Sequence, residues 1–255
     1  MDLGLDGRTV IVTGASGGLG RHIARGFATE GADVVLTYRR SRPNAEHVAE
    51  QISKETGGRA LVVRYELGDA DAARALAEAA LEWTGRIDVL VNNAVHWGGD
   101  APSPDRPFEA VPDADWLKVL RANTEGALRL SRAVAPAMRE RRWGRMVHIS
   151  SSIAVDGMAG SEYYAAAKAA LHGFSRSAAF GLGRDGDILS NVVMPGLTRT
   201  DTNAAITEVA GHHYSALAPI GRLLDAAEVA GPVVYLGSAA NTGITGQAIT
   251  VTGGA

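Results

Sequence analysis

Short runs of apolar, often β-branched residues alternate along the chain with longer amphipathic stretches. Most of the short runs are apolar throughout, a pattern typical of strands that are buried on both faces of a parallel sheet. The runs that predict strands are Thr9–Val12, Asp33–Tyr38, Ala60–Tyr65, Ile87–Val91, Arg145–Ile149, Ile188–Val193 and Ala248–Val251. The stretches that predict helices lie near residues 19–30, 44–56, 70–84, 113–141, 162–184 and 225–237. This alternation predicts an α/β fold, a doubly wound parallel sheet of about seven strands with helices on both faces.

No low-complexity linker or short repeat divides the sequence, so we expect a single domain over residues 1–255. In sheets of this kind, ligands bind outside the carboxyl ends of the strands. We therefore expect the functional side chains near the carboxyl ends of the strands.

A glycine-rich turn, residues 13–20, follows the first predicted strand directly, and a helix begins within it. Gly14, Gly18 and Gly20 permit a tight turn and a close approach of the backbone to a pyrophosphate, whose charge is favoured at a helix N-terminus. A plain glycine-rich turn is the alternative. The position between a strand and a helix favours a dinucleotide site.

The second predicted strand ends at Tyr38 and is followed by Arg39 and Arg40, with no acidic residue nearby. An acid at this point would hold the ribose 2′-hydroxyl of NAD, whereas an arginine accommodates the 2′-phosphate of NADP. Two ordinary surface arginines are the alternative. The pattern predicts NADP(H), with Arg39 as the first candidate for the phosphate contact.

Tyr164 and Lys168 are four residues apart in an Ala-rich stretch that predicts a helix, so they share one face. A tyrosine titrates near about 10, and a neighbouring cation lowers that pKa, which would make the phenol a usable proton donor. Ser151 lies thirteen positions upstream. The same spacing also occurs by chance on ordinary helices.

The composition of the chain argues against several classes of protein. The 255 residues carry a net charge of −3, which leaves no electrostatic footprint for nucleic acid, and there is no cysteine for disulfides or thiolate metal sites. We expect no metal. The N-terminal residues show no signal peptide, and no apolar run approaches the ~20 residues that span a membrane. These features predict a cytoplasmic protein without membrane partners.

Several short motifs occur in a fixed order. They are Thr13–Gly20, Asn92-Asn93-Ala94, Asn123, Ser151, Tyr164 with Lys168, and Pro195-Gly196. In order and spacing they resemble the short-chain dehydrogenase/reductase family over essentially the whole chain. The resemblance implies a Rossmann-type sheet and a hydride-transfer enzyme that uses a nicotinamide cofactor.

The resemblance also implies roles for single residues. Tyr164 would protonate a carbonyl oxygen as hydride arrives, and Ser151 would hydrogen-bond to the same oxygen. Lys168 would hold the ribose hydroxyls and lower the pKa of Tyr164, and Asn123 would hold a water of the proton relay. The cofactor-binding set is Gly14, Ser16, Gly18, Leu19, Gly20, Arg39, Arg40, Glu66, Leu67, Asn92, Ala94, Tyr164, Lys168, Pro195, Gly196, Thr198 and Thr200. Within it, Asn92 would lie near the adenine-side ribose.

The chain departs from the family pattern at three points. Val95 stands where the family has a glycine, which adds bulk where the chain passes close to cofactor and substrate. Glu66 replaces the usual Asp near the adenine. Ser16 and Gly17 are neutral where NADP-dependent members often carry a basic residue, which weakens the NADP prediction without reversing it.

The glycine-rich turn after Ala94 resembles aromatic polyketide ketoreductases. The pocket residues expected on this basis are His96, Trp97, Ser151, Val155, Met158, Leu197 and Tyr214, with a substrate lid around residues 197–220. Apolar and aromatic walls of this kind suit a flat ligand. We therefore expect a polycyclic, polyketide-type ketone of secondary metabolism, such as an angucycline-like intermediate of antibiotic biosynthesis.

Two alternatives stay open. Reduction of a 3-oxoacyl group on an acyl-carrier protein would need basic residues beside the cleft, where Arg142 fits but the mostly acidic stretch 184–187 does not. A non-catalytic dinucleotide sensor is the more distant alternative. The stretches 113–141 and 162–184 correspond to helices that family members use for assembly, so we expect a homo-oligomer, a homotetramer.

Overall fold

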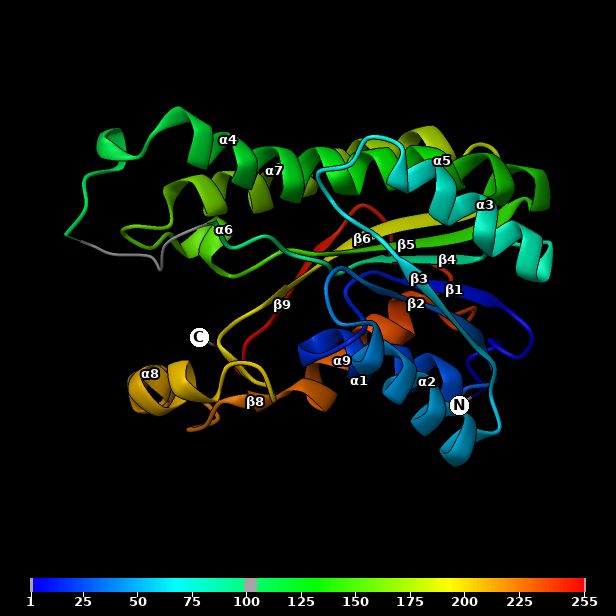
Figure 1. Ribbon diagram of the computed structural model, residues 1–255, viewed down its shortest axis with the longest axis horizontal. Coiled ribbons are helices and arrows are strands. Elements are labelled where there is room, and N and C mark those ends of the chain that lie inside the picture. Colours follow the sequence, from blue (N-terminus) through cyan, green and yellow to red (C-terminus); the bar gives the residue numbers. More distant parts are fainter. Residues whose placement is uncertain (1, 99–104, 255) are drawn as a thin grey trace.

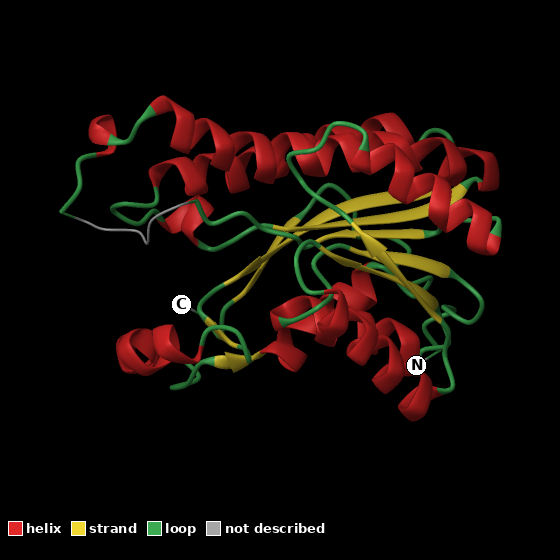
Figure 2. Cartoon of the chain, in the orientation of Figure 1, coloured by secondary structure: helices red, strands yellow, loops and turns green. Residues whose placement is uncertain are grey.

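The computed structural model describes residues 2–98 and 105–254, and a seven-stranded parallel sheet forms its centre (Figures 1 and 2). The strands are β1 (Thr9–Val12), β2 (Asp33–Tyr38), β3 (Ala60–Arg64), β4 (Val89–Asn92), β5 (Trp143–Ile149), β6 (Asp187–Pro195) and β9 (Ala248–Val251). Their order is β3-β2-β1-β4-β5-β6-β9, and every neighbouring pair is parallel. The chain order reverses between β1 and β4, which is where such sheets bind ligands. The predicted fold class is confirmed.

Helices cover both faces of the sheet (Figure 1). One layer holds α1 (Gly18–Thr29), α2 (Arg42–Thr56) and α9 (Ala226–Leu236). The other holds α3 (Ala72–Thr84), α4 (Asp113–Leu120), α5 (Gly126–Arg141) and α7 (Glu162–Leu182). None of the helices in the described part of the chain is long and apolar enough to cross a membrane.

Successive side chains of a central strand pack into two separate hydrophobic cores, one on each face of the sheet. In β1, Val10 and Val12 pack with Ile23 and Phe27 of α1, whereas Ile11 packs with the helices of the opposite layer. All five side chains are fully buried. Because successive side chains of a strand point to opposite faces, a continuously apolar strand can supply both cores, as the sequence pattern indicates.

The predicted helix over residues 113–141 is interrupted. A π-helical turn, Arg121–Glu125, separates α4 from α5 and contains Asn123. The Asn123 amide donates to the Val119 carbonyl at 2.9 Å, so a side chain enters the hydrogen-bond ladder of the helix. Such π turns often occur at functional sites. The helical periodicity on both sides hid this interruption in the sequence.

Beyond the carboxyl edge of the sheet lie smaller elements that the sequence pattern did not predict. They are α6 (Ile153–Asp156), α8 (Ala204–Leu217), and the two-residue strands β7 (Thr198–Arg199) and β8 (Leu224–Asp225), which pair with each other. The helix α8 falls within the expected lid segment and stands apart from the main body (Figure 1). Other element boundaries differ from the predicted ones by one or two residues, as strand and helix ends often do.

The amino edge of the sheet is held by Arg145 of β5, whose side chain is fully buried. Its guanidinium donates to the carbonyls of Ser238, Gly144, Asp187 and Asn241 and to the Asp187 carboxylate. The ring of Trp143 lies between two cations, with Arg8 at 3.6 Å and Arg145 at 4.3 Å from its centroid. The buried guanidinium charge is tolerated here because each of its nitrogens donates to an oxygen.

Candidate active site

The glycine-rich turn lies between β1 and α1, at the carboxyl edge of the sheet. Gly14 and Gly18 have φ of +67° and +53°, a conformation that side chains other than glycine rarely adopt. A Cβ at Gly20 would collide with the Gly14 carbonyl. Ser16 and Leu19 are half-buried on the same turn. The three glycines thus form the cradle that the sequence predicts, with the N-terminus of α1 beside it.

The end of β4 fastens this turn through Asn93, which the sequence analysis did not single out. The Asn93 amide donates to the Thr13 carbonyl at 2.8 Å, and the backbone N–H groups of Asn93 and Ala94 both donate to the Thr13 hydroxyl at 2.9 Å. The expected site residue Ala94 is therefore beside the cradle. Val95 takes no positive φ, so the backbone accepts the residue that replaces the family glycine.

Asn92 has a different place from the one expected beside the adenine-side ribose. Its side chain turns inward and contacts the Ser131 hydroxyl at 3.1 Å and His148 Nδ1 at 3.1 Å. His148 is fully buried. Its Nε2 lies 3.5 Å from the Ser190 hydroxyl, and its ring packs edge-on against Phe174. Burial lowers the pKa of His148 to about 4, so the ring is neutral. The Asn92 side chain thus supports the sheet and does not line the crevice.

The arginines that the sequence assigns to NADP lie after β2. Arg39 is half-buried and its Nε lies 3.7 Å from the Glu66 carboxylate, while Arg40 is exposed. Leu67, next to Glu66, packs so closely that a Cβ on Gly126 would meet its carbonyl at 2.8 Å. Arg39 and Glu66 are therefore brought together after β2 and β3, and Leu67 packs against the start of α5.

An acidic residue that the sequence analysis did not single out caps the cradle. One oxygen of the Asp201 carboxylate accepts from the Gly18 N–H at 2.9 Å, and the other pairs with Arg21 at 2.8 Å. The N-cap residue of α1, Gly17, has no side chain to offer. Asp201, 183 positions along the chain, thus supplies the anion that this helix N-terminus favours.

The loop that carries Asp201 follows β6, which ends at Pro195. The Thr198 hydroxyl donates to the Gly196 carbonyl at 3.0 Å, and the Thr200 N–H donates to the Asn203 amide oxygen at 2.9 Å. The Asn203 amide nitrogen returns to the Thr198 carbonyl at 2.8 Å. Asn203, which the sequence analysis missed, therefore braces both predicted threonines.

Ser151, Tyr164 and Lys168 meet at the carboxyl end of β5. Ser151 lies beside the Tyr164 phenol and acts to lower its pKa, and the Lys168 ammonium lies 5.8 Å from the phenol ring centroid. Lys168 is buried and donates to the Ile149 carbonyl at 2.8 Å, and burial lowers its pKa to about 8. The predicted catalytic tyrosine, lysine and serine are thus placed together.

The pKa of Tyr164 does not behave as the sequence indicated. Burial raises the pKa of this phenol above its ordinary value, and Ser151 opposes that rise. Desolvation dominates because the phenol is only 9% exposed. The net shift of the Tyr164 pKa is therefore upward, whereas the sequence predicts a lowering.

Asn123 is buried in the π turn and ties the loop after β4 to the helix layer. Its amide donates to the His96 carbonyl at 2.7 Å and its oxygen accepts from the His96 N–H at 2.9 Å. Both amide hydrogens are used, since the second goes to Val119. Thr124 in the same turn donates to the Ala167 carbonyl, beside Lys168. The side chain thus positions the loop, which differs from the water-holding role expected of it.

Several of the expected pocket residues are exposed or half-buried side chains. Trp97 stacks on Tyr164 with 4.8 Å between ring centroids and an interplanar angle of 25°. Trp97 is 64% exposed and Val155 of α6 is 67% exposed. The Tyr214 hydroxyl of α8 contacts the Met158 sulfur at 3.7 Å, which joins the lid helix to the loop after α6. Leu197, at the start of the lid, is half-buried.

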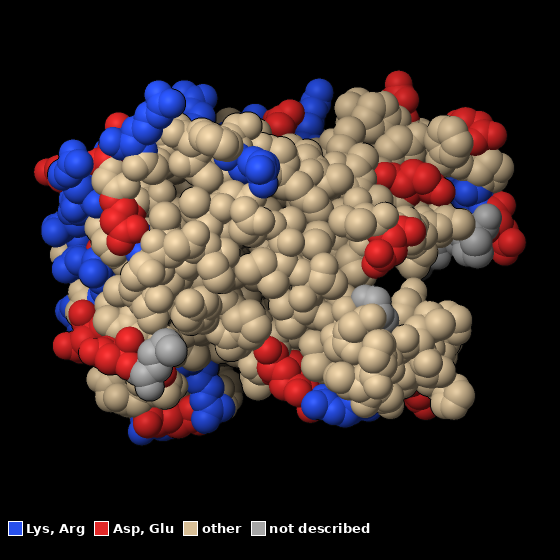
Figure 3. Space-filling model, turned by 180° about the vertical axis from the view of Figure 1, so that it is seen from behind, with Lys and Arg blue, Asp and Glu red and all other residues tan. Residues whose placement is uncertain are grey.

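Charges are unevenly distributed around the molecule. Figure 3 shows a notch beside the lobe that contains α8, with mostly acidic side chains around it, and Lys and Arg gathered at the opposite end. Arg142 precedes β5, whereas Ser151 follows it, so the two lie roughly 20 Å apart along the strand direction. Arg184 also lies at that amino edge, before β6, beside Asp185, which pairs with Arg139. Within one chain, neither arginine borders the cluster.

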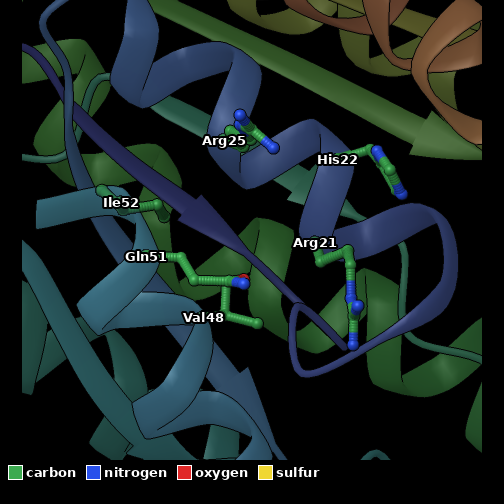
Figure 4. A pocket seen from close by; sticks show the side chains of 6 residues that line it. All are labelled: Arg21, His22, Arg25, Val48, Gln51 and Ile52. Carbon is green, nitrogen blue, oxygen red and sulfur yellow. The ribbon is translucent and has the colours of Figure 1, made fainter. Parts of the chain in front are cut away.

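A hollow between α1 and α2 is separate from this chemistry. It has a volume of about 140 Å³ and is lined by Arg21, His22, Arg25, Val48, Gln51 and Ile52 (Figure 4). Ligand pockets usually measure roughly 300–1,000 Å³, so this hollow is too small for one. Within residues 2–98 and 105–254, no three His, Cys, Asp or Glu side chains gather as a metal site.

Known proteins resemble this chain over its whole length. A family model described as enoyl-(acyl carrier protein) reductase matches residues 14–255. A 3-oxoacyl-[acyl-carrier-protein] reductase of Aquifex aeolicus is 34% identical over 254 residues, which cover 100% of this chain and 99% of the relative. The 7alpha-hydroxysteroid dehydrogenase of Escherichia coli is 35% identical over 254 residues, which cover 99% and 96%.

Among solved structures, a 3-oxoacyl (acyl-carrier-protein) reductase from Agrobacterium tumefaciens, crystallised with NADP bound, superposes with a TM-score of 0.89. It is 32% identical, and the match covers 100% of this chain and 96% of that one. The relatives thus share a fold and a reaction class, while their names cover acyl-carrier and steroid substrates.

Proposed function

Because the chain belongs to the short-chain dehydrogenase/reductase family and is an oxidoreductase, we propose that it uses NADPH to reduce a ketone to a secondary alcohol. The observation that carries this proposal is the cluster of Ser151, Tyr164 and Lys168 beside the glycine cradle. A phenol, a hydroxyl and a buried ammonium converge there at the carboxyl edge of the sheet.

The cradle fits a dinucleotide. Only glycine fits at position 20, where the helix packs directly on the Gly14 carbonyl, and the N-terminus of α1 at Gly18 favours an anion. Arg39, now held by Glu66, would take the 2′-phosphate that distinguishes NADPH from NADH. When bound, the nicotinamide supplies the hydride. Thr198 and Thr200, braced by Asn203, would hold its carboxamide.

The residues of this chain supply the proton and hold the oxygen. Ser151 would donate to the substrate carbonyl oxygen, and Tyr164 would transfer its phenolic proton to that oxygen as negative charge develops there. Lys168 would stabilise the phenolate that remains, because an ammonium near the ring favours the charged form. One hydride and one proton convert the ketone to the alcohol, and the phenol regains its proton from solvent.

Substitution of Tyr164 by Phe tests this assignment. The variant should lose nearly all turnover and bind NADPH with little change, because only the transferable proton is removed. Measurements of NADPH binding and of ketone turnover on the wild-type protein also distinguish an enzyme from a dinucleotide sensor. Wild-type protein that binds NADPH but reduces no ketone would support the sensor, and unchanged turnover in the variant would show that another group donates the proton.

For the substrate, we favour a polycyclic ketone of polyketide type. Its support is the exposed apolar side chains of Trp97 and Val155, together with the acidic side chains around the notch in Figure 3. A hydroxysteroid dehydrogenase, whose name states a polycyclic substrate, is as similar to this chain as the acyl-carrier-protein reductases are. Identity alone therefore does not choose between them.

Reduction of a carrier-bound 3-oxoacyl group is the second candidate, and the relatives named for that activity favour it. Against it stand Arg142 and Arg184, which lie at the far edge of the sheet within one chain. An NADPH-oxidation assay that compares an acetoacetyl thioester with a polycyclic quinone decides between the two. Strong turnover of the thioester alone would establish the second candidate.

We also propose that the chain forms a homotetramer through the helix layer that holds α5 and α7. Phe180 of α7 is 69% exposed, which is unusual for a large aromatic side chain and fits a contact between copies. Light scattering should give four times the 26.5 kDa mass of one chain. A stable monomer would contradict this.

A further inference from the structure

Two neighbouring tyrosines of α7 are each stacked against a tryptophan. Trp97 stacks on Tyr164 at 4.8 Å between centroids, and Trp116 stacks on Tyr163 at 5.1 Å with an interplanar angle of 14°. The Tyr163 hydroxyl also donates to the Phe108 carbonyl. Trp97 and Trp116 lie near the two ends of the excursion between β4 and α4, so this excursion is attached to α7 at both ends.

The two stacks differ in what surrounds them. Tyr164 has Ser151 beside its hydroxyl and the Lys168 ammonium over its ring, whereas Tyr163 has neither neighbour. Trp97 therefore contacts the proton donor of the proposed reaction, and Trp116 contacts a tyrosine that only supports the loop. The pair provides a matched comparison inside one protein.

The position of Trp97 is set by its neighbour in sequence. Asn123 clamps both the N–H and the carbonyl of His96, at 2.9 Å and 2.7 Å, directly before Trp97. The indole thus leaves a fixed backbone and lies on the phenol. Its contact helps to bury Tyr164 to 9% exposure, although Trp97 itself remains 64% exposed.

Tyr164 covers one face of the indole, and a ring stacked on the opposite face would lie too far from the phenol for its ketone oxygen to reach the Tyr164 hydroxyl. A ketone whose oxygen reaches that hydroxyl must lie within a few ångströms of the phenol ring, and so beside the exposed edge of Trp97. A planar ring system can present its face to this edge and gain the contact energy of an edge-to-face aromatic pair, whereas a flexible acyl chain presents no ring face. Val155 of α6, 67% exposed, is a further apolar surface on the same side of the sheet.

We propose that Trp97 positions Tyr164 and selects ketones carried on flat ring systems over open-chain ketones. This inference rests on the proposed function, because it needs Tyr164 to be the proton donor. It assigns substrate selection to one side chain of the loop after β4, with Asn123 as the residue that holds that side chain in place.

The test compares Trp97→Ala and Trp97→Phe with the control Trp116→Ala. The readout is the ratio of kcat/KM for a bicyclic aromatic ketone, 1-tetralone, to kcat/KM for the open-chain ethyl acetoacetate. Loss of the indole edge in Trp97→Ala should lower this ratio about tenfold. Trp97→Phe keeps a ring and should lie within about threefold of wild type, and Trp116→Ala should leave the ratio unchanged.

A second readout follows the phenol itself. Ultraviolet titration of wild type minus Tyr164→Phe isolates the Tyr164 signal among the tyrosines, and the same difference is taken in the Trp97→Ala background. Because solvent enters when the indole is removed, the pKa of Tyr164 should move downward toward its ordinary value. A merely structural role for Trp97 would lower stability without moving this titration.

The outcomes are separable from those of the proposed function. If Trp97→Ala leaves both the substrate ratio and the Tyr164 titration unchanged, or if Trp116→Ala changes the ratio equally, the inference is wrong while ketone reduction stands. If wild type reduces neither ketone, the proposed function fails on these substrates and the selection claim falls with it. A lowered ratio together with a shifted titration would establish Trp97 in both roles.

Discussion

Replacing Asp201 by Asn should make the protein bind NADPH more tightly. The Asp201 carboxylate occupies the Gly18 N–H at the α1 N-terminus and pairs with Arg21. A bound pyrophosphate would place its own charge beside this carboxylate, so two anions would compete for one helix end. Asn keeps the oxygen that accepts from Gly18 and removes the charge.

The magnitude follows from the distances and the exposure. Two unit charges 4 Å apart interact by about 1 kcal/mol in water and about 4 kcal/mol at an effective dielectric of 20. The side chains of Arg21 and Asp201 are 31% and 39% exposed, so solvent screens this site and the lower end applies. Loss of the repulsion by about 1.4 kcal/mol corresponds to a tenfold lower Kd.

The assay is a titration of NADPH fluorescence at low and at high salt. The matched control is Glu55→Gln, which removes a carboxylate from Arg25 on the same helix, also at 2.8 Å, but away from the cradle. Asp201→Asn should tighten binding at low salt, the gain should shrink at high salt, and the control should change little. Unchanged or weaker binding in Asp201→Asn would refute the competition and indicate that Asp201 supports the bound state.

Three further outcomes follow from single residues. Arg39→Ala should weaken NADPH binding about tenfold or more and leave NADH binding nearly unchanged, and equal losses for both cofactors would remove Arg39 from the 2′-phosphate site. Arg145→Met leaves several buried carbonyls unpaired and should cost about 3–5 kcal/mol of unfolding free energy, seen as a melting temperature lower by roughly 10 °C. His148 is neutral in the fold with its pKa lowered from 6.5 to about 4, so the unfolded chain binds more protons between these values. Unfolding free energy should therefore fall by up to about 3 kcal/mol as pH drops from 6.5 to 4, and less in His148→Asn.

Much of the fold could be read from local patterns. The central strands appear as short apolar runs because they are buried on both faces, and Val10, Ile11 and Val12 show why such a run need not alternate with polar residues. The π turn at Asn123 escaped this reading, since helical periodicity continues on both sides of it. Within it the Asn123 side chain hydrogen-bonds to the Val119 carbonyl, a contact that no periodicity records.

The candidate site divides in the same way. The glycine cradle, the pairing of Tyr164 with Lys168 and the assignment to a dehydrogenase family all depend on residue types at short, regular spacings. Such spacings place side chains on one helix face or in one turn whatever the rest of the chain does. These parts could therefore be predicted with no structure.

Tertiary structure decided which distant groups meet. Asp201 reaches Gly18 across 183 positions, Trp97 lies on Tyr164, and Asn92 turns into the sheet while Asn93 faces the cradle. Each of these contacts joins separate elements, so it depends on strand order and on the path of the loops. The pKa of Tyr164 belongs here too: the sequence places a cation four residues away, but only packing determines that burial raises the phenol pKa. Local chemistry is written in the spacing of residues, and its environment is set by how the sheet assembles.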